Sequence, residues 1–173
     1  MTPKISVRIV CQVAMLIALS FVLERLVPPI NLPTFRISFA FIPMMCCGML
    51  FGPVWGAAAY GIADILGWPI MGLTPIPLIL LSRIISGAIF GFVLYRKDLK
   101  FAPHALLSSF SEQIICGAGI TTLGLSLSFG QPYVPLLVTR IPQLAVHVAL
   151  QLAVFPVLVK FKTVLYNTGI VAT

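Results

Sequence analysis

One face of a predicted helix carries the most suggestive chemistry in this chain. In the stretch from Gly52 to Pro69, Tyr60, Asp64 and Trp68 recur every four residues, and they therefore share one side of a helix. A carboxylate flanked by two aromatic rings can accept hydrogen bonds from the donor edge of a flat heterocycle while the rings stack on it. The pattern predicts a site for an amino-substituted aromatic ring.

Further polar side chains lie inside apolar segments elsewhere in the chain. They are Arg36, Arg83, Glu112, Arg140, Gln143, His147 and Gln151. Arg140, Gln143 and His147 are spaced as i, i+3 and i+7 and share a helix face. Arginines bind carboxylate or phosphate bidentately, so an aromatic acid with a nitrogen-rich ring would satisfy both groups of residues. The alternative is that these groups only hold the helices together.

The composition predicts that these residues sit in a membrane protein. Of the 173 residues, 60% are hydrophobic and 9% are charged, and the mean hydropathy is +1.09. Soluble domains carry about 25% charged residues. We expect one integral-membrane domain over residues 1–173, with the first apolar run kept as a helix because it lacks a small-x-small cleavage site.

Proline and glycine clusters divide the apolar sequence into six expected transmembrane helices, which makes the predicted fold an all-α bundle. Their approximate ranges are 5–27, 36–51, 53–68, 76–95, 103–128 and 133–165. A spanning helix needs about 20 residues, so the last range must tilt, kink or protrude.

The basic residues support this count. Six spans put both termini and the fourth connection on one side, together with seven of the eleven basic residues: Lys4, Arg8, Arg96, Lys97, Lys100, Lys160 and Lys162. The positive-inside rule makes that side cytoplasmic, and this placement argues against nucleic-acid binding. The other four, Arg25, Arg36, Arg83 and Arg140, fall in the outer half. An arginine inside a bilayer costs about 2.5–3.5 kcal/mol, so such residues are functional candidates, although Arg25 can also pair with Glu24.

Several catalytic classes lack their motifs. None of the five lysines follows a glycine, so the chain has no phosphate-binding loop for ATP hydrolysis. His104 and His147 belong to different helices and fit no zinc motif, and the four cysteines lack metal-ligand spacing. We expect neither an enzyme nor a bound metal or cofactor.

The run RISFAFIPMMCCGMLFGPVWGAAAYGIADILG, Arg36 to Gly67, resembles the signature region of the S-components of energy-coupling factor (ECF) transporters, and most of all their folate-specific branch. The resemblance rests on the opening Arg-Ile, Pro43, the Leu-Phe-Gly-Pro at Leu50–Pro53, and Asp64 ahead of Leu-Gly. Ala14 and Ala18 are similar to that family's AxxxA motif.

This resemblance implies a fold, a ligand and partners. The fold is a six-helix S-component bundle in the bacterial cell membrane, with outer loops at about 28–35, 68–76 and 129–133 capping a vitamin. The ligand is folate, and the implied binding residues are Arg36, Asp64, Trp68, Arg83 and Arg140. The partners are a membrane coupling protein, approached through Ala14 and Ala18, and two ATPase subunits that supply the energy while the S-component topples.

Asp64 would then accept from the pterin ring, Tyr60 or Trp68 would stack on it, and the glutamate carboxylates would meet the arginines. Three alternatives remain open. One is an S-component for another anionic vitamin such as biotin, the second is an intramembrane enzyme, and the third is a channel or other non-transport membrane subunit, which would show no saturable vitamin binding.

Overall fold

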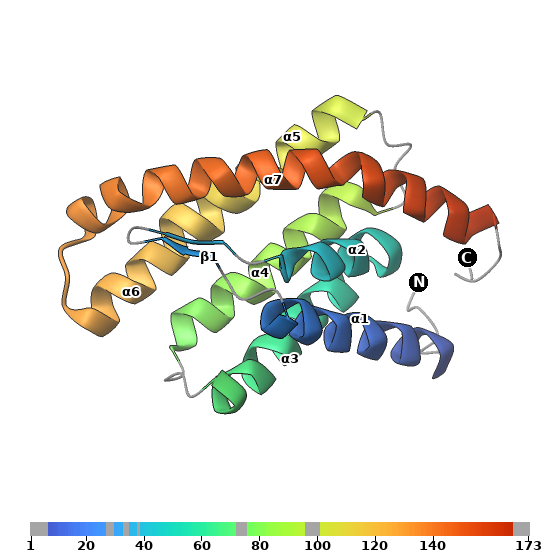
Figure 1. Ribbon diagram of the computed structural model, residues 1–173, viewed down its shortest axis with the longest axis horizontal. Coiled ribbons are helices and arrows are strands. Elements are labelled where there is room, and N and C mark those ends of the chain that lie inside the picture. The colour runs from blue at the N-terminus through green and yellow to red at the C-terminus, as the bar shows by residue number, and fades with distance from the viewer. Residues whose placement is uncertain are drawn as a thin grey trace.

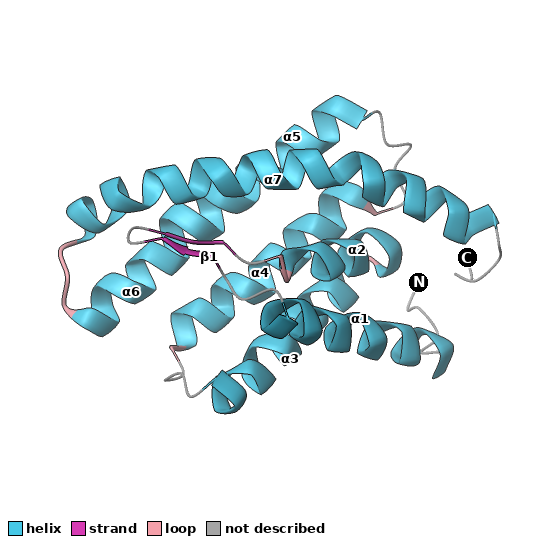
Figure 2. Cartoon of the chain, viewed as in Figure 1, coloured by secondary structure: helices cyan, strands magenta, loops and turns pink. Residues whose placement is uncertain are grey.

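The chain folds into a helical bundle with one small hairpin (Figures 1 and 2). The structure is a computed structural model that describes residues 7–26, 30–32, 35–37, 39–71, 76–95 and 101–167. Its elements are α1 (Val7–Leu26), β1 (Ile30–Leu32), β2 (Phe35–Ile37), α2 (Phe41–Phe51), α3 (Pro53–Met71), α4 (Pro77–Leu94), α5 (Phe101–Glu112), the π-helix η1 (Gln113–Thr121), α6 (Thr122–Phe129) and α7 (Tyr133–Asn167). Because α5, η1 and α6 run on without a break, these elements form six helical segments, and the predicted all-α fold is confirmed.

The start of the second helix is a correction. The sequence predicted a helix from residue 36, but residues 35–37 form β2, which pairs antiparallel with β1 so that Asn31 lies opposite Arg36. Isoleucine and phenylalanine at the flanking positions favour extended backbone. The helix itself begins at Phe41 and has 11 residues.

The fifth helical segment also differs from a regular α-helix. Its middle nine residues, η1, form a π-helix. Such wide turns are rare and occur often at functional sites. Gly117 and Gly119 lie within it, and glycine lowers the stability of a regular helix, which helps to explain why the pattern changes here.

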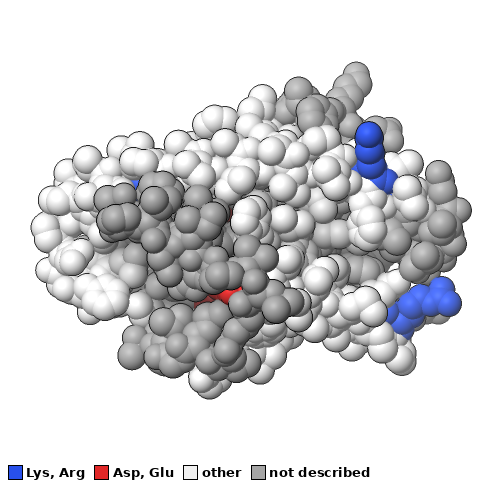
Figure 3. All heavy atoms as spheres, in the orientation of Figure 1, with Lys and Arg blue, Asp and Glu red and all other residues white. Residues whose placement is uncertain are grey.

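Three helical stretches of the described chain are long and apolar enough to cross a membrane, namely Val7–Glu24, Pro77–Leu94 and Tyr133–Val164. The last belongs to α7, whose 35 residues extend over about 52 Å. α1 begins and α7 ends at the same end of the bundle (Figure 1). Most of the lysine and arginine side chains visible in Figure 3 lie at that end.

The short helix α2 forms much of the core. Nine of its 11 residues are buried, among them Met44, Met45 and Met49. They pack with Phe90 of α4 and Phe155 of α7. Because methionine is flexible and polarisable, it fills the irregular space between helices that cross at different angles.

Glycines bring α2, α3 and α4 into backbone contact. A Cβ atom built on Gly56 of α3 would lie 2.6 Å from the carbonyl oxygen of Gly87 on α4. One built on Gly48 of α2 would lie 2.9 Å from the amide nitrogen of Gly91. Small residues allow helices in lipid to approach this closely. This glycine contact fixes α3 against α4, and the next residues along the two helices form the candidate site.

Candidate functional site

The glycine contact determines which side chains face each other farther along α3 and α4. On α3, Tyr60 and Asp64 follow Gly56 at intervals of four residues and so occupy the same face. On α4, Arg83 precedes Gly87 by four residues. Because Gly56 packs on Gly87, the two stripes continue side by side and bring Asp64 within reach of Arg83.

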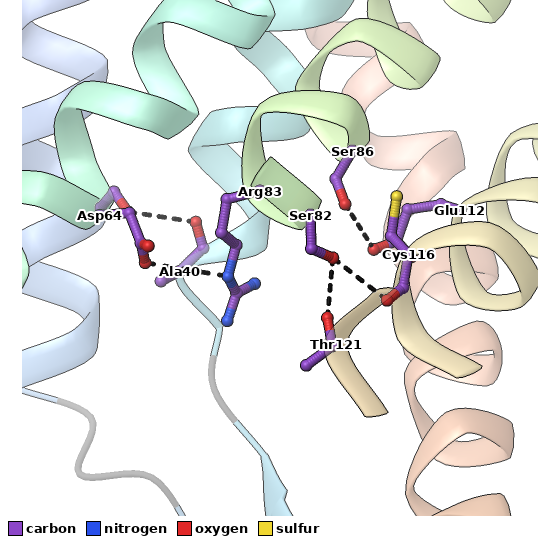
Figure 4. A network of polar contacts seen from close by, with 9 residues as sticks. Ala40, Asp64, Ser82, Arg83, Ser86, Glu112, Cys116 and Thr121 are labelled. Atoms are coloured by element: carbon purple, nitrogen blue, oxygen red, sulfur yellow. Dashed lines mark hydrogen bonds and ion pairs between the residues drawn. The ribbon is translucent and has the colours of Figure 1, made fainter. Parts of the chain in front are cut away.

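Asp64 and Arg83 form the ionic centre of the site (Figure 4). The Asp64 Oδ1 atom lies 4.0 Å from Arg83 Nε, and the side chains are 20% and 52% exposed, respectively. The second oxygen, Oδ2, is buried and accepts no hydrogen bond from the described residues. A buried carboxylate oxygen without a donor is costly, so this atom is suited to accept a hydrogen bond from a ligand.

The two aromatic residues that flank Asp64 have different surroundings. Tyr60 is 6% exposed, and its ring stacks on Phe90 with centroids 6.5 Å apart. Trp68 is only partly buried and lies near the Asp64 carboxylate. The sequence left open which ring stacks on a ligand. The structure leaves Trp68 as the more accessible of the two.

Glu112 accepts hydrogen bonds from three helical segments. Ser86 Oγ of α4 donates to Oε1 over 3.1 Å, while the amides of Gln113 and Gln151 donate to Oε2 over 2.7 and 3.2 Å. Both oxygens are therefore satisfied by the chain itself. In the structure the Glu112 carboxylate joins α4, η1 and α7, and Figure 4 shows its contact with Ser86. That Glu112 binds substrate stays a prediction.

Arg140 lies on α7 and is half-buried. Its Nη1 donates to the hydroxyl of Thr122 over 3.3 Å, and it is close enough to Arg83 for the two positive charges to interact. Within the described residues Arg140 has no carboxylate partner. Two guanidinium groups near one another, one of them without a counterion in this part of the chain, favour the binding of an anion.

The remaining predicted site residues are less central or fall outside the description. His147 contacts the ring of Phe41 at a centroid distance of 6.3 Å, and Gln143 is partly buried on the same helix. Ala14 and Ala18 are exposed on α1. Arg36 lies on β2, but its side chain, like that of Arg25, lies outside the described residues.

Sequence reasoning missed Thr122 and the π-helix that carries its partner. Thr122 is fully buried and donates to the carbonyl oxygen of Gly117 over 2.9 Å. The signal for this arrangement was weak, because a Thr-Thr pair after two glycines is compatible with an ordinary helix. Only the contact with Arg140 in the folded chain shows that the Thr122 hydroxyl lies at the candidate site.

Comparisons with known proteins agree with this architecture. Residues 9–159 match the family described as "ECF transporter, substrate-specific component". A folate transporter, FolT, of Clostridium novyi is 28% identical over 141 residues, which cover 81% of this chain and 81% of that protein. The FolT of Streptococcus mutans is 28% identical over 144 residues, covering 76% of this chain and 74% of that protein.

Two solved structures have the same fold. A crystal structure of FolT bound with folic acid superposes with a TM-score of 0.70 at 27% identity, covering 94% of this chain and 95% of that one. The S-component for biotin from an ECF-type ABC transporter has a TM-score of 0.67 at 18% identity, covering 92% and 95%. At that identity the second structure is evidence of the fold alone. Since the family match spans most of the chain, this membrane protein belongs to the substrate-specific components of ECF transporters.

Proposed function

We propose that this chain is the folate-binding membrane subunit of an ATP-driven ECF vitamin importer. Two relatives that are folate transporters and the likeness to a folic acid complex support this ligand. One observation in the site carries the proposal. It is the Asp64 carboxylate, held beside Arg83 with one buried oxygen that has no donor in the described chain.

The chemistry of folate fits these groups. Its pterin ring has an amino group and a ring N–H on one edge. Each of them can donate a hydrogen bond to Asp64 Oδ2. Trp68, which lies beside the carboxylate and is only partly buried, supplies a face for stacking. The carboxylates of the glutamate tail carry two negative charges, for which Arg83, Arg140 and Arg36 are the cationic partners in the outer half.

Transport requires partners that this chain lacks. We propose that a membrane coupling protein packs against the exposed Ala14 and Ala18 of α1, where small side chains permit close helix contact. Two ATPase subunits would supply the energy. The chain would cross a bacterial cell membrane six times with both termini in the cytoplasm, in keeping with the basic residues near its ends.

Vitamin titrations of the purified protein test the ligand. The chain has tryptophans at positions 55 and 68, and we expect saturable one-to-one quenching by folic acid that disappears in Trp68→Phe and persists in Trp55→Phe. Thiamine and biotin serve as controls. If biotin binds more tightly than folic acid, the proposed ligand becomes biotin, and the assignment to the family stands. Absence of binding by any vitamin, in a sample with a cooperative melt, would refute the proposal.

A further inference from the structure

The π-helix η1 is bonded to its neighbours through three consecutive carbonyl groups. Ser82 of α4 donates to Cys116 O over 3.1 Å, Thr122 to Gly117 O over 2.9 Å, and Tyr133 of α7 to Ala118 O over 2.9 Å. A carbonyl oxygen has two lone pairs, so each can accept a side chain in addition to its helix bond. The bonds from Ser82 and Tyr133 tie η1 to α4 and α7, while the bond from Thr122 lies within the helical segment of η1 itself.

The hydrogen-bond directions at Thr122 follow from its single proton. The hydroxyl gives that proton to Gly117 O, so only its lone pairs face Arg140, whose Nη1 donates to them over 3.3 Å. Thr122 is fully buried. The threonine therefore holds one corner of the guanidinium group, and the other N–H groups of Arg140 have no acceptor among the described residues.

The neighbouring Thr121 serves the other arginine-bearing helix. Its hydroxyl lies 2.7 Å from that of Ser82. Because the Ser82 hydroxyl donates its single proton to Cys116 O, the Thr121 hydroxyl is the donor in its contact with Ser82. Ser82 directly precedes Arg83 in the sequence. The adjacent threonines thus fix α4 next to Arg83 and α7 at Arg140, and they determine how the two positive charges are arranged.

We infer that Thr122 is a positioning residue that orients Arg140 for a carboxylate of the ligand, and that it thereby contributes to selectivity for ligands with a glutamate tail. This inference rests on the proposed function. A like-charged neighbour, Arg83, would otherwise drive the Arg140 side chain away. An arginine already held in place loses less conformational entropy when it binds, so the carboxylate gains more from it.

Two ligands separate this role from a general effect on stability. Folic acid carries the two carboxylates of the glutamate tail, whereas pteroic acid has the same ring system and ends in one benzoate carboxylate, at the place where folic acid has its amide. We expect Thr122→Val to weaken folic acid binding about tenfold and pteroic acid binding less than about twofold, because only the tail carboxylates use Arg140. Thr122→Ser, which retains the hydroxyl, should bind both like the unchanged protein.

Thr139→Val is the matched control, because Thr139 is exposed beside Arg140 and, among the described residues, its hydroxyl donates to Leu136 O of its own helix alone. It should change neither affinity. If the Thr122→Val protein does not fold, the affinity of the Arg140→Gln variant for the same two ligands is measured instead. We expect this variant to lose affinity for folic acid and to keep its affinity for pteroic acid.

Other outcomes overturn the inference. An equal loss of both ligands in Thr122→Val would make Thr122 purely structural, and unchanged folic acid binding would remove its role altogether. If the unchanged protein binds neither compound, the proposed function itself fails and the inference fails with it. If it binds both equally well while Arg140→Gln has no effect, folate binding stands and only the inference is wrong.

Discussion

The two ends of the α3–α4 pair are built from the same four-residue spacing but perform different tasks. Toward one end, Gly56 and Gly87 bring the backbones into contact. Toward the other end, Asp64 and Arg83 lie 4.0 Å apart and remain partly exposed. The first end provides rigidity through van der Waals packing, and the second provides charge and a buried acceptor. We therefore expect the geometry of the proposed ligand site at Asp64 and Arg83 to depend on the glycine contact, which lies outside that site.

The largest expected effect comes from filling the glycine contact. In Gly87→Ala the new methyl group would overlap the backbone of Gly56, so the helices must separate. We expect a loss of about 3 kcal/mol in the free energy of unfolding, at the upper end of what overpacking costs, and loss of folic acid binding. Thermal unfolding in detergent measures this.

Gly67→Ala is the matched control on α3, because its nearest neighbour would be Phe21 Cε1 at 3.8 Å, an ordinary contact. If the two alanine variants melted alike, the claimed role of the glycine contact would be wrong.

At the charged end, Asp64→Asn should reduce folic acid affinity about a hundredfold with little change in melting temperature. The amide weakens the attraction to Arg83 and presents the ligand with a single acceptor oxygen instead of two. Glu24→Gln changes another acid, on α1, and should bind normally. Equal affinities for both variants, read by calorimetric titration, would remove Asp64 from the site.

Glu112 accepts a hydrogen bond from Ser86, which lies between Arg83 and Gly87 on α4, and we expect it to behave like a structural residue. In Glu112→Gln an NH2 group replaces one oxygen and faces a donor, Ser86 or one of the two glutamines, so about 2 kcal/mol of stability should be lost. The loss of affinity should be smaller than for Asp64→Asn. Ser111→Ala is the neighbouring control. A variant of normal stability that binds poorly would instead support the prediction that Glu112 binds the ligand.

The smallest effect is expected at the far end of α4. Lys162 Nζ of α7 donates to Leu94 O in the last turn over 3.4 Å. Lys162→Met should cost about 0.5–1 kcal/mol in unfolding free energy and leave binding unchanged. Lys160→Met, at an exposed position, should cost less. A change in folic acid affinity for Lys162→Met would mean that this end communicates with the site.

The sequence was informative where periodicity and charge were strong. The six helical segments followed from apolar length and from the prolines and glycines between them, and the shared face of Tyr60, Asp64 and Trp68 followed from their four-residue spacing. The pairing of β1 (Ile30–Leu32) with β2 (Phe35–Ile37) was missed because three-residue strands leave too short a pattern to separate from the start of a helix.

The partners of individual polar groups were harder to predict. Helical spacing places Glu112 on a face but cannot show that Ser86 and Gln151, far away in the sequence, satisfy its oxygens. Likewise, nothing in a Thr-Thr pair reveals a π-helix or a bond to Arg140. Such contacts depend on how the helices cross, which is set by the glycine contact and by the bulky residues of α2.

A structure of this protein with folic acid bound would test the central claim most directly, through the distance from Asp64 Oδ2 to the nearest nitrogen of the pterin ring. We predict a hydrogen bond of about 2.7–3.2 Å, with Trp68 against the ring and the glutamate carboxylates toward Arg140. A pterin ring bound away from Asp64, with Oδ2 still lacking a donor from the ligand, would contradict it.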